Sequence, residues 1–158
     1  DIPGFLTWLH TNGYFTAPAS RKHHGSHEGG LFEHSFAVAK TLKRLTEDNG
    51  LVWLNDRSPV FVGLFHDICK VDQYKQQMDS FEWEYRDDML LKGHGDKSVM
   101  LLASLIQLTG AGGMGIRYHM GAFTAESEWT DYTRAVRRYP NVLLTHQADM
   151  IAAHVMVV

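Results

Sequence analysis

The sequence lacks the features that mark several common classes of protein. It has one cysteine, Cys69, so no disulfide can form within the chain, which suits a reducing compartment. It has no signal peptide and no apolar run of about 18 residues or more, so we expect no membrane span. A net charge of −3 excludes the strongly basic surface that attracts nucleic acid. We therefore expect a cytoplasmic protein with no membrane association and no stable nucleic-acid partner.

What is present describes an ordinary globular domain with one unusual residue type. The chain has 158 residues, of which 44% are apolar and 21% charged, enough for one domain with a substantial core. We find no internal repeat, low-complexity tract or linker, so residues 1–158 are treated as a single domain. Histidine is the exception, because ten are present and they are spread along the chain. Dispersed histidines suit a site assembled from several helices.

Apolar residues recur mostly at three- or four-residue spacing, which predicts an all-α helical bundle. Helices are expected at residues 2–12, 31–48, 58–70, 97–108, 126–139 and 141–157. Gly63, within the most apolar of these helices, would let another helix approach closely. Aromatic and acidic residues alternate over residues 81–85, which predicts a small β-hairpin excursion around residues 72–88. The glycine-rich residues 110–115 are expected to form a flexible turn.

Residues 14–30 are rich in glycine, serine, histidine and proline and are predicted to form a long loop. A loop of this length within a small domain is usually functional or disordered. Its basic and imidazole side chains would suit contact with a ligand: Arg21, Lys22, His23, His24 and His27. The alternative is a basic loop that only faces solvent, and the sequence leaves both interpretations open.

The dipeptide His66-Asp67 follows an apolar run. A buried carboxylate is costly unless it is paired, hydrogen-bonded or bound to a metal. Alone, the dipeptide could face water at a helix end, and His34 could be an ordinary core histidine. Other segments complete a mixed imidazole and carboxylate set: His34, His66, Asp67, His94, His119 and Asp149. Such a set suits Zn, Mn, Fe or Co more than Ca, and Asp67 could bridge two ions.

In this order and on these segments, the six residues resemble the HD-domain superfamily of metal-dependent phosphohydrolases. The segments HHGSHEGGLFEHS, LFHDICK, GHGDKS, IRYHMG and HQADMIAAH resemble short HD hydrolases of bacteriophages and prophages. The resemblance covers about residues 23–154 and implies a helical bundle that hydrolyses phosphoester or phosphoanhydride bonds, in the cytoplasm of a bacterial host if the chain is phage-encoded. It implies two divalent ions (Zn, Mn, Co, Fe or Mg), one held by His34, His66, Asp67 and Asp149 and the other by Asp67, His94 and His119.

Lys70 departs from one subgroup of this superfamily. One-metal HD deoxynucleotidases often have an acidic residue three positions after the aspartate, whereas Lys70 resembles the phosphate-contacting lysine of HD phosphodiesterases. The resemblance thus implies a metal-activated water as nucleophile, with Asp67 and Lys70 as catalytic residues and no identified general acid. The expected substrate contacts are Arg21, Lys22, His24, His27 and Lys70.

Several functions are compatible with this pattern. Small size, mild acidity and the phage-like resemblance favour a nucleotide phosphohydrolase, and within that class a deoxynucleoside triphosphate triphosphohydrolase, with dATP as one candidate substrate. The first alternative is a 3′–5′ exoribonuclease or a phosphodiesterase acting on cyclic nucleotides. The second is a non-catalytic, metal-stabilised binding module. The sequence leaves open the base, the sugar, the bond cleaved, the native metal and whether the chain forms a homo-oligomer.

Overall fold

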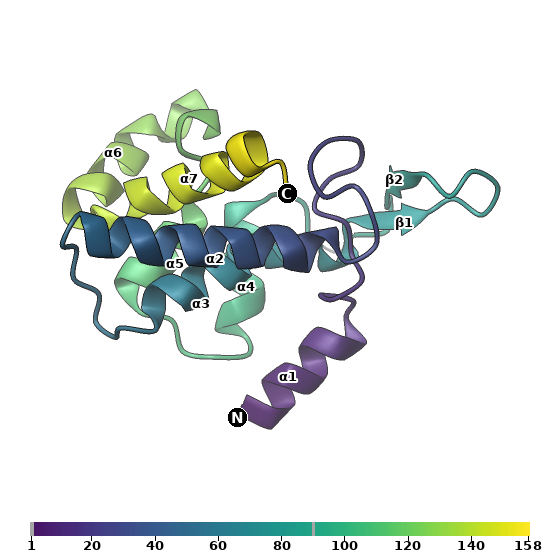
Figure 1. Ribbon diagram of the computed structural model, residues 1–158, viewed down its shortest axis with the longest axis horizontal. Coiled ribbons are helices and arrows are strands. Elements are labelled where there is room, and N and C mark those ends of the chain that lie inside the picture. Colours follow the sequence, from purple (N-terminus) through teal and green to yellow (C-terminus); the bar gives the residue numbers. More distant parts are fainter. Residues whose placement is uncertain (1, 90) are drawn as a thin grey trace.

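The computed structural model describes residues 2–89 and 91–158 and confirms an all-α bundle with one small hairpin (Figure 1). The helices are α1 (Ile2–Thr11), α2 (Gly30–Asp48), α3 (Ser58–Phe65), α4 (Gly95–Ala103), α5 (Gly110–Arg117), α6 (Trp129–Arg138) and α7 (Asn141–Ile151). The hairpin consists of β1 (Tyr74–Gln76) and β2 (Trp83–Tyr85). Among the described residues, no helix combines the length and apolar character needed to cross a membrane.

Helix α2 runs along the length of the bundle between α7 and α3 (Figure 1). Its apolar stripe places Leu31, Val38 and Leu42 fully out of solvent. Helix α3 crosses it at Gly63, where an added Cβ would lie 2.4 Å from the Ala39 Cα. The close approach predicted from Gly63 is therefore confirmed. It brings the C-terminal end of α3 next to the middle of the bundle.

The end of α3 differs from the single helix predicted through residue 70. The α-helix ends at Phe65, and a 3-10 turn, Ile68–Asp72, follows it. Asp67 adopts φ −105° and ψ 19°, which breaks the helical path. In a 3-10 turn, residues three apart lie one above the other, so the side chains of Asp67 and Lys70 meet. The chain here turns both charged side chains toward the interior.

The prediction of a flexible turn at residues 110–115 was wrong, because these residues begin helix α5. Thr109 caps the helix, its hydroxyl accepting a hydrogen bond from the Gly112 amide at 3.1 Å. A Cβ at Gly112 would meet Val62 at 3.6 Å, and one at Gly115 would lie 3.2 Å from the Thr145 hydroxyl. Close packing of α5 against its neighbours thus outweighs the poor helix propensity of glycine.

The other helix boundaries lie closer to the predicted ones. Helix α4 begins at Gly95 and ends at Ala103, five residues before the predicted end. Helix α7 continues into a π-helical turn, Ala152–Met156, so the last helix covers nearly the predicted length. The polar helix predicted at 126–139 is confirmed as a short 3-10 turn followed by α6.

The predicted loop before α2 is ordered by its own backbone. Its two arms are joined by amide-to-carbonyl hydrogen bonds from Ala19 to Gly25 (2.8 Å), Gly29 to Thr16 (3.0 Å) and Leu31 to Ala17 (3.0 Å). Gly25 has φ +57°, which favours glycine, and its carbonyl lies where a Cβ on Gly30 would stand. The segment is therefore a packed wall beside α2.

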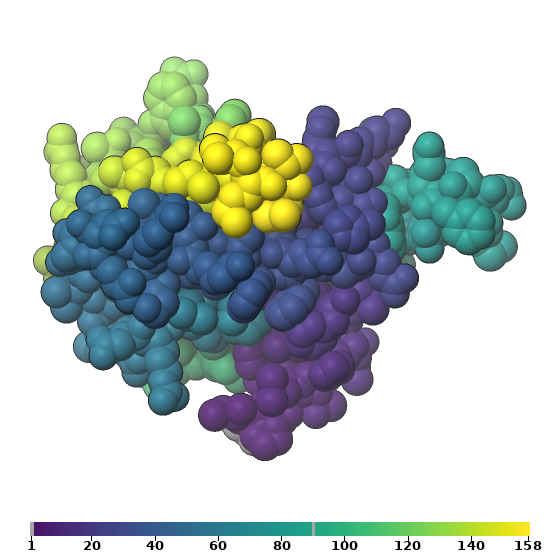
Figure 2. Space-filling view, viewed as in Figure 1, coloured from purple at the N-terminus to yellow at the C-terminus, as the bar shows by residue number. Residues whose placement is uncertain are grey.

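The hairpin extends from the bundle beside this loop, as Figures 1 and 2 show. Strands β1 and β2 pair antiparallel, with Tyr74 opposite Tyr85 and Gln76 opposite Trp83. The rings of Tyr74 and Tyr85 lie 5.2 Å apart between centroids. The cross-strand pair stands at the base of the hairpin, where β1 follows the 3-10 turn that carries Lys70.

Candidate metal centre

Three buried histidines are held in the same way. In each, Nδ1 is hydrogen-bonded to a backbone carbonyl: His34 to Val158 (2.8 Å), His66 to Gly63 (2.8 Å) and His119 to Ile116 (2.7 Å). A carbonyl only accepts, so Nδ1 carries the hydrogen and Nε2 of the neutral ring keeps its lone pair. This is the tautomer of a histidine that binds metal through Nε2.

The free Nε2 atoms face carboxylate oxygens. His34 Nε2 lies 3.0 Å from Asp149 Oδ1, and His66 Nε2 lies 3.7 Å from the same atom. His119 Nε2 lies 3.3 Å from Asp67 Oδ1. The Nε2 atoms of His66 and His119 are buried and have no hydrogen-bond partner in the described chain. Lone pairs directed at carboxylates in a buried site need a cation between them, so these residues fit a metal ion.

All six predicted ligands come together, with their ligand atoms in overlapping groups. Within the part of the chain that the structure describes, three groups have ligand atoms within 4.8 Å of one another: His34, His66 and Asp149; His66, Asp67 and His119; and Asp67, Cys69 and His94. Asp67 belongs to two of the groups and His66 to two. This overlap is compatible with more than one ion, and the assignment of residues to each ion stays a prediction.

His94 is held differently from the other histidines. Its Nε2 lies 2.7 Å from Asp67 Oδ1, and its Nδ1 lies 3.4 Å from the sulfur of the buried Cys69. Burial would lower the pKa of His94, but the neighbouring Asp67 and Cys69 outweigh it and raise the pKa to about 10. The sequence analysis did not identify Cys69 as a residue of the candidate site, although Cys69 lies two residues after Asp67 and therefore on the same turn.

Both carboxylates of the centre are ionised. Burial would raise the pKa of Asp67, but Lys70, His94 and His66 hold it well below its ordinary value. Burial likewise opposes the charge on Asp149, while the neighbouring His34 and His66 keep its pKa well below the ordinary range. Ionised carboxylates are the state that a divalent metal requires, whereas His94 and His66, whose pKa values are raised, would have to lose their extra proton when a metal binds.

Lys70 places a positive charge at the edge of this centre. Its Nζ lies 2.6 Å from Asp67 Oδ2, and its side chain is only 9% exposed. Burial would lower the pKa of Lys70, but the Asp67 carboxylate more than compensates and raises it. Lys70 therefore stays protonated and can donate to an anionic ligand.

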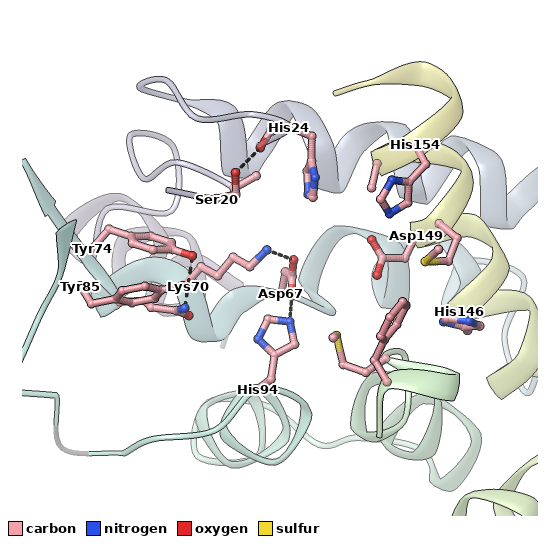
Figure 3. A pocket seen from close by; sticks show the side chains of 16 residues that line it. Ser20, His24, Asp67, Lys70, Tyr74, Tyr85, His94, His146, Asp149 and His154 are labelled. Atoms are coloured by element: carbon pink, nitrogen blue, oxygen red, sulfur yellow. Dashed lines mark hydrogen bonds and ion pairs between the residues drawn. The ribbon is translucent and has the colours of Figure 1, made fainter. Parts of the chain in front are cut away.

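A cavity of about 280 Å³ opens onto the centre (Figure 3). Asp67, His94, Asp149 and Lys70 line it, and so does His24 of the loop before α2. Burial, together with the nearby His34 and Lys70, lowers the pKa of His24 to about 4. His24 is therefore a neutral imidazole at neutral pH.

The remaining predicted substrate contacts lie outside this cavity. The guanidinium of Arg21 lies 5.6 Å from the ring centre of Tyr85. Tyr85 lines the cavity, so Arg21 contacts a lining residue but does not line the cavity itself. Lys22 is exposed on the loop. His27 is exposed and bonds Glu33 at 2.9 Å. Roles for these three residues in substrate binding stay predictions.

The sequence analysis missed several residues that line the cavity: Gln73, Tyr74, Tyr85, Met120, Phe123, His146, Met150 and His154. The two histidines in this set, His146 and His154, could have been noticed in the sequence, because they flank Asp149 on the last helix. His146 is fixed by a hydrogen bond from its Nδ1 to the His119 carbonyl at 2.8 Å. A Cβ at Gly121 would lie 2.4 Å from the His146 ring, so no side chain fits there.

The helical bundle and its buried cluster of imidazoles and carboxylates define the class of a metal-dependent hydrolase. A model of the HD domain family matches residues 31–153, which is most of the chain. The chain therefore belongs to the HD domain family, a superfamily of metal-dependent hydrolases that act on phosphate compounds. No curated protein and no solved structure matches it.

Proposed function

We propose that this protein hydrolyses nucleotides and that its substrate is a deoxynucleoside triphosphate. The observation that carries the proposal is the position of Lys70, which pairs with the ionised Asp67 at 2.6 Å and, like Asp67, lines a cavity of about 280 Å³ that could admit part of a phosphate chain. A wall of candidate metal ligands beside the Lys70 ammonium group would suit a substrate that carries several negative charges. The mild net charge of −3 suits a free nucleotide better than a long nucleic acid.

Each group of residues in the candidate site has a distinct proposed role in hydrolysis. His34, His66, Asp67, His94, His119 and Asp149 would hold the metal. When bound, a divalent ion supplies a water nucleophile at neutral pH and offsets charge on the phosphoryl group. Lys70 would donate a hydrogen bond to a phosphoryl oxygen, where charge develops during the reaction. His24, being neutral, can accept or donate a hydrogen bond at the rim of the cavity.

The direct experiment is a product assay. Protein loaded separately with Mn, Zn or Co would be incubated with each deoxynucleoside triphosphate, and all phosphorus-containing products would be followed. We expect phosphate or triphosphate release from at least one of them. A protein with verified bound metal that releases nothing from any of them would contradict the proposal.

Two substitutions separate metal binding from catalysis. Asp67→Ala should abolish hydrolysis and lower the metal content, with the helical circular dichroism unchanged. Lys70→Ala should keep the metal and lower kcat by about 10²- to 10³-fold, the effect of removing one donor that stabilises developing charge. An Asp67→Ala protein that remains fully active would refute the assignment of the centre.

One observation supports a second function. Lys70, in the position that resembles HD phosphodiesterases, would serve a phosphodiester equally well. Labelled RNA oligonucleotides and cyclic nucleotides therefore belong in the same assay. Shortening of the RNA or opening of the cyclic nucleotide, with deoxynucleoside triphosphates left intact, would favour this alternative. A protein that binds Mn or Zn and is stabilised by it, yet hydrolyses none of these substrates, would favour the metal-stabilised binding module instead.

A further inference from the structure

The hairpin ends in a tip that exposes two large apolar side chains. The tip, residues 77–82, connects β1 to β2, and Figures 1 and 2 show it projecting from the bundle. Met78 is 92% exposed and Phe81 is 74% exposed. The Phe81 amide donates to the Gln77 carbonyl at 3.1 Å, and the Gln77 amide donates to the Glu82 carbonyl at 2.9 Å. The tip is therefore a hydrogen-bonded turn that presents both side chains to its surroundings.

Phe81 stands at a backbone position that suits a smaller residue. Its φ is 57°, in the left-handed region where glycine or asparagine is usual and a bulky side chain is strained. Strain of this kind concentrates at functional sites. Burial within the chain does not explain the ring, because most of its surface is exposed. Contact with another molecule would explain both the exposure and the strain.

The charge of the tip restricts what it can contact. The tip carries two carboxylates, Asp79 and Glu82, and no lysine or arginine. Closer to the bundle, Glu84 pairs with Lys75, whereas the two tip carboxylates have no ion pair among the residues that the structure describes. A surface that fits the tip must therefore offer an apolar side chain with cationic groups beside it.

Helix α6 offers such a surface. It carries three arginines and one aspartate, a net charge of +2, which is the most positive among the described helices. Beside it lies a hollow of about 440 Å³, lined by Trp129, Thr130, Thr133, Arg134 and Arg137. Trp129 is 50% exposed, and its indole Nε1 donates to the Thr124 carbonyl at 2.9 Å, which holds the ring in place.

The two arginines of the hollow can receive two carboxylates. Arg134 and Arg137 are three residues apart on one helix, so their side chains are neighbours. Within the described chain, Arg137 has no ion-pair partner. Arg134 bonds Asp131 at 3.1 Å through Nη1 and has further donors for a second carboxylate. Tryptophan and arginine are also the residues that most often dominate the affinity of protein interfaces.

The other exposed apolar side chains lie among balanced or absent charges: Ile2, Leu6, Phe36, Val52, Leu54, Val155 and Val157. Helix α1 and residues 152–158 contain no lysine, arginine or acidic residue. Helix α2 has three basic and three acidic residues, and the loop over residues 51–57 has one of each. None of these surfaces complements the acidic tip as α6 does.

We propose that the tip of one copy of this protein docks in the hollow on α6 of a second copy, with Phe81 against Trp129 and the two tip carboxylates facing Arg134 and Arg137. Figure 1 shows the hairpin and α6 at opposite ends of the molecule, so a tip cannot reach the α6 of its own chain. A contact between two different surfaces is repeated from copy to copy and gives a ring or an open chain. This inference does not depend on the proposed function.

Sedimentation velocity of the protein over a wide range of concentration tests the contact. The average mass should exceed that of a monomer and rise with concentration, and salt should weaken the association by screening the exposed charges. Arg137→Glu places a carboxylate against the acidic tip, and Phe81→Gly removes the ring while suiting the positive φ. Each substitution should weaken self-association by about tenfold or more.

Mixing the two variants gives the sharpest result. The Arg137→Glu protein keeps an intact tip, and the Phe81→Gly protein keeps an intact α6. Each variant alone should therefore be largely monomeric, whereas an equimolar mixture should form a one-to-one pair that grows no further. A symmetrical or non-specific association would not produce this pattern.

Phe36→Ala and Arg44→Glu on α2 are the controls, because they alter an exposed phenylalanine and an exposed arginine outside both surfaces. Both should self-associate as the parent protein does. Circular dichroism checks that every variant is folded. A parent protein that is monomeric at all concentrations, a tip or α6 variant that associates as the parent does, a control that weakens association equally, or a mixture that forms no pair would overturn the proposal.

Discussion

At the scale of single residues, the partner of each ring nitrogen decides what a histidine can do. His34, His66 and His119 give Nδ1–H to backbone carbonyls, which do not change with side-chain substitution. His94 instead has the sulfur of Cys69 at 3.4 Å. For His94 to bind a metal through Nε2, its Nδ1–H must be directed at that sulfur. Cys69 would thus set the orientation of one candidate ligand, a role that backbone carbonyls would perform for His34, His66 and His119.

Replacing Cys69 should therefore weaken metal binding without unfolding the protein. We expect Cys69→Ala to lower the affinity for the more weakly held ion by about 10- to 100-fold, the usual effect of losing a group that orients a ligand. Cys69→Ser, which keeps an acceptor, should recover most of the loss. Calorimetric titration with Zn or Co measures this. Equal affinities for the alanine variant and the parent protein would show that the thiol only fills space.

His24 gives the stability of the protein a defined pH dependence. Its pKa is about 4 in the folded protein, against 6.5 for the free side chain, so between these values the unfolded chain binds more protons. The stabilisation from keeping His24 neutral is thus complete above pH 6.5 and is lost as pH falls toward 4. Urea denaturation of chelator-treated protein should show His24→Gln less sensitive than the parent to acid in this window. If the free energy of unfolding depends on pH in the same way for both proteins, this prediction is wrong.

The six candidate ligands could be identified from sequence because each lies on or next to a helical pattern, and their role in binding metal stays a prediction. Cys69 could not, because its contact with His94 depends on the 3-10 turn that replaces the end of α3. The Tyr74 and Tyr85 wall was missed for a similar reason. The hairpin was expected, but the sequence did not give its register, and the cavity that Tyr74 and Tyr85 line is completed by residues far away in sequence.

At the scale of secondary-structure elements, the α2–α3 crossing positions the centre, because His34 lies on α2 and His66 directly follows α3. A Cβ on Gly63 would overlap the Ala39 backbone. Gly63→Ala should therefore push the helices apart and destabilise the protein by about 1–3 kcal/mol, the range for overpacking a core.

Gly113 on α5 is the matched control for this substitution, since a Cβ there would meet nothing within 4 Å and its φ is not positive. Gly113→Ala should stabilise the protein by about 0.5–1 kcal/mol through helix propensity alone. Urea denaturation measures both changes. Similar effects of the same sign at the two positions would contradict the importance of the crossing.

Helix α5 also shows where sequence patterns mislead at this scale. Its four glycines at 110, 112, 113 and 115 predict a turn by propensity. Two of them nevertheless pack closely in the helix, because a Cβ at Gly112 would contact Val62 at 3.6 Å and one at Gly115 would lie only 3.2 Å from the Thr145 hydroxyl. Those neighbours lie 30 or more residues away in sequence, so local pattern alone could not identify the packing that favours the helix.

At the scale of the whole molecule, the centre joins segments from α2 to the end of the chain. A bound ion should therefore stabilise the entire fold. At a free-ion concentration of about 100 times the dissociation constant, the bound ion would add about 2.7 kcal/mol to the free energy of unfolding. In a protein of this size, that corresponds to a rise in Tm of about 5–10 °C. Melting with EDTA, and again after Zn or Mn is restored, measures the difference.

Asp149→Asn provides the control, because it removes the charge that faces His34 and His66. The Tm of the Asp149→Asn variant should rise much less on addition of the ion than the Tm of the parent protein. A Tm of the parent protein that is the same with and without bound metal would show that the ion contributes nothing to the fold.

The backbone-ordered loop before α2 has a further consequence for the energetics of recognition. Its amide-to-carbonyl bonds and the Gly25–Gly30 contact fix the wall that carries Ser20 and His24. The loss of conformational entropy in this wall therefore occurs during folding and does not reduce the affinity for a ligand. A preorganised rim of this kind favours ligands that match its existing shape, so selectivity should arise mainly from misfit of the wrong compound.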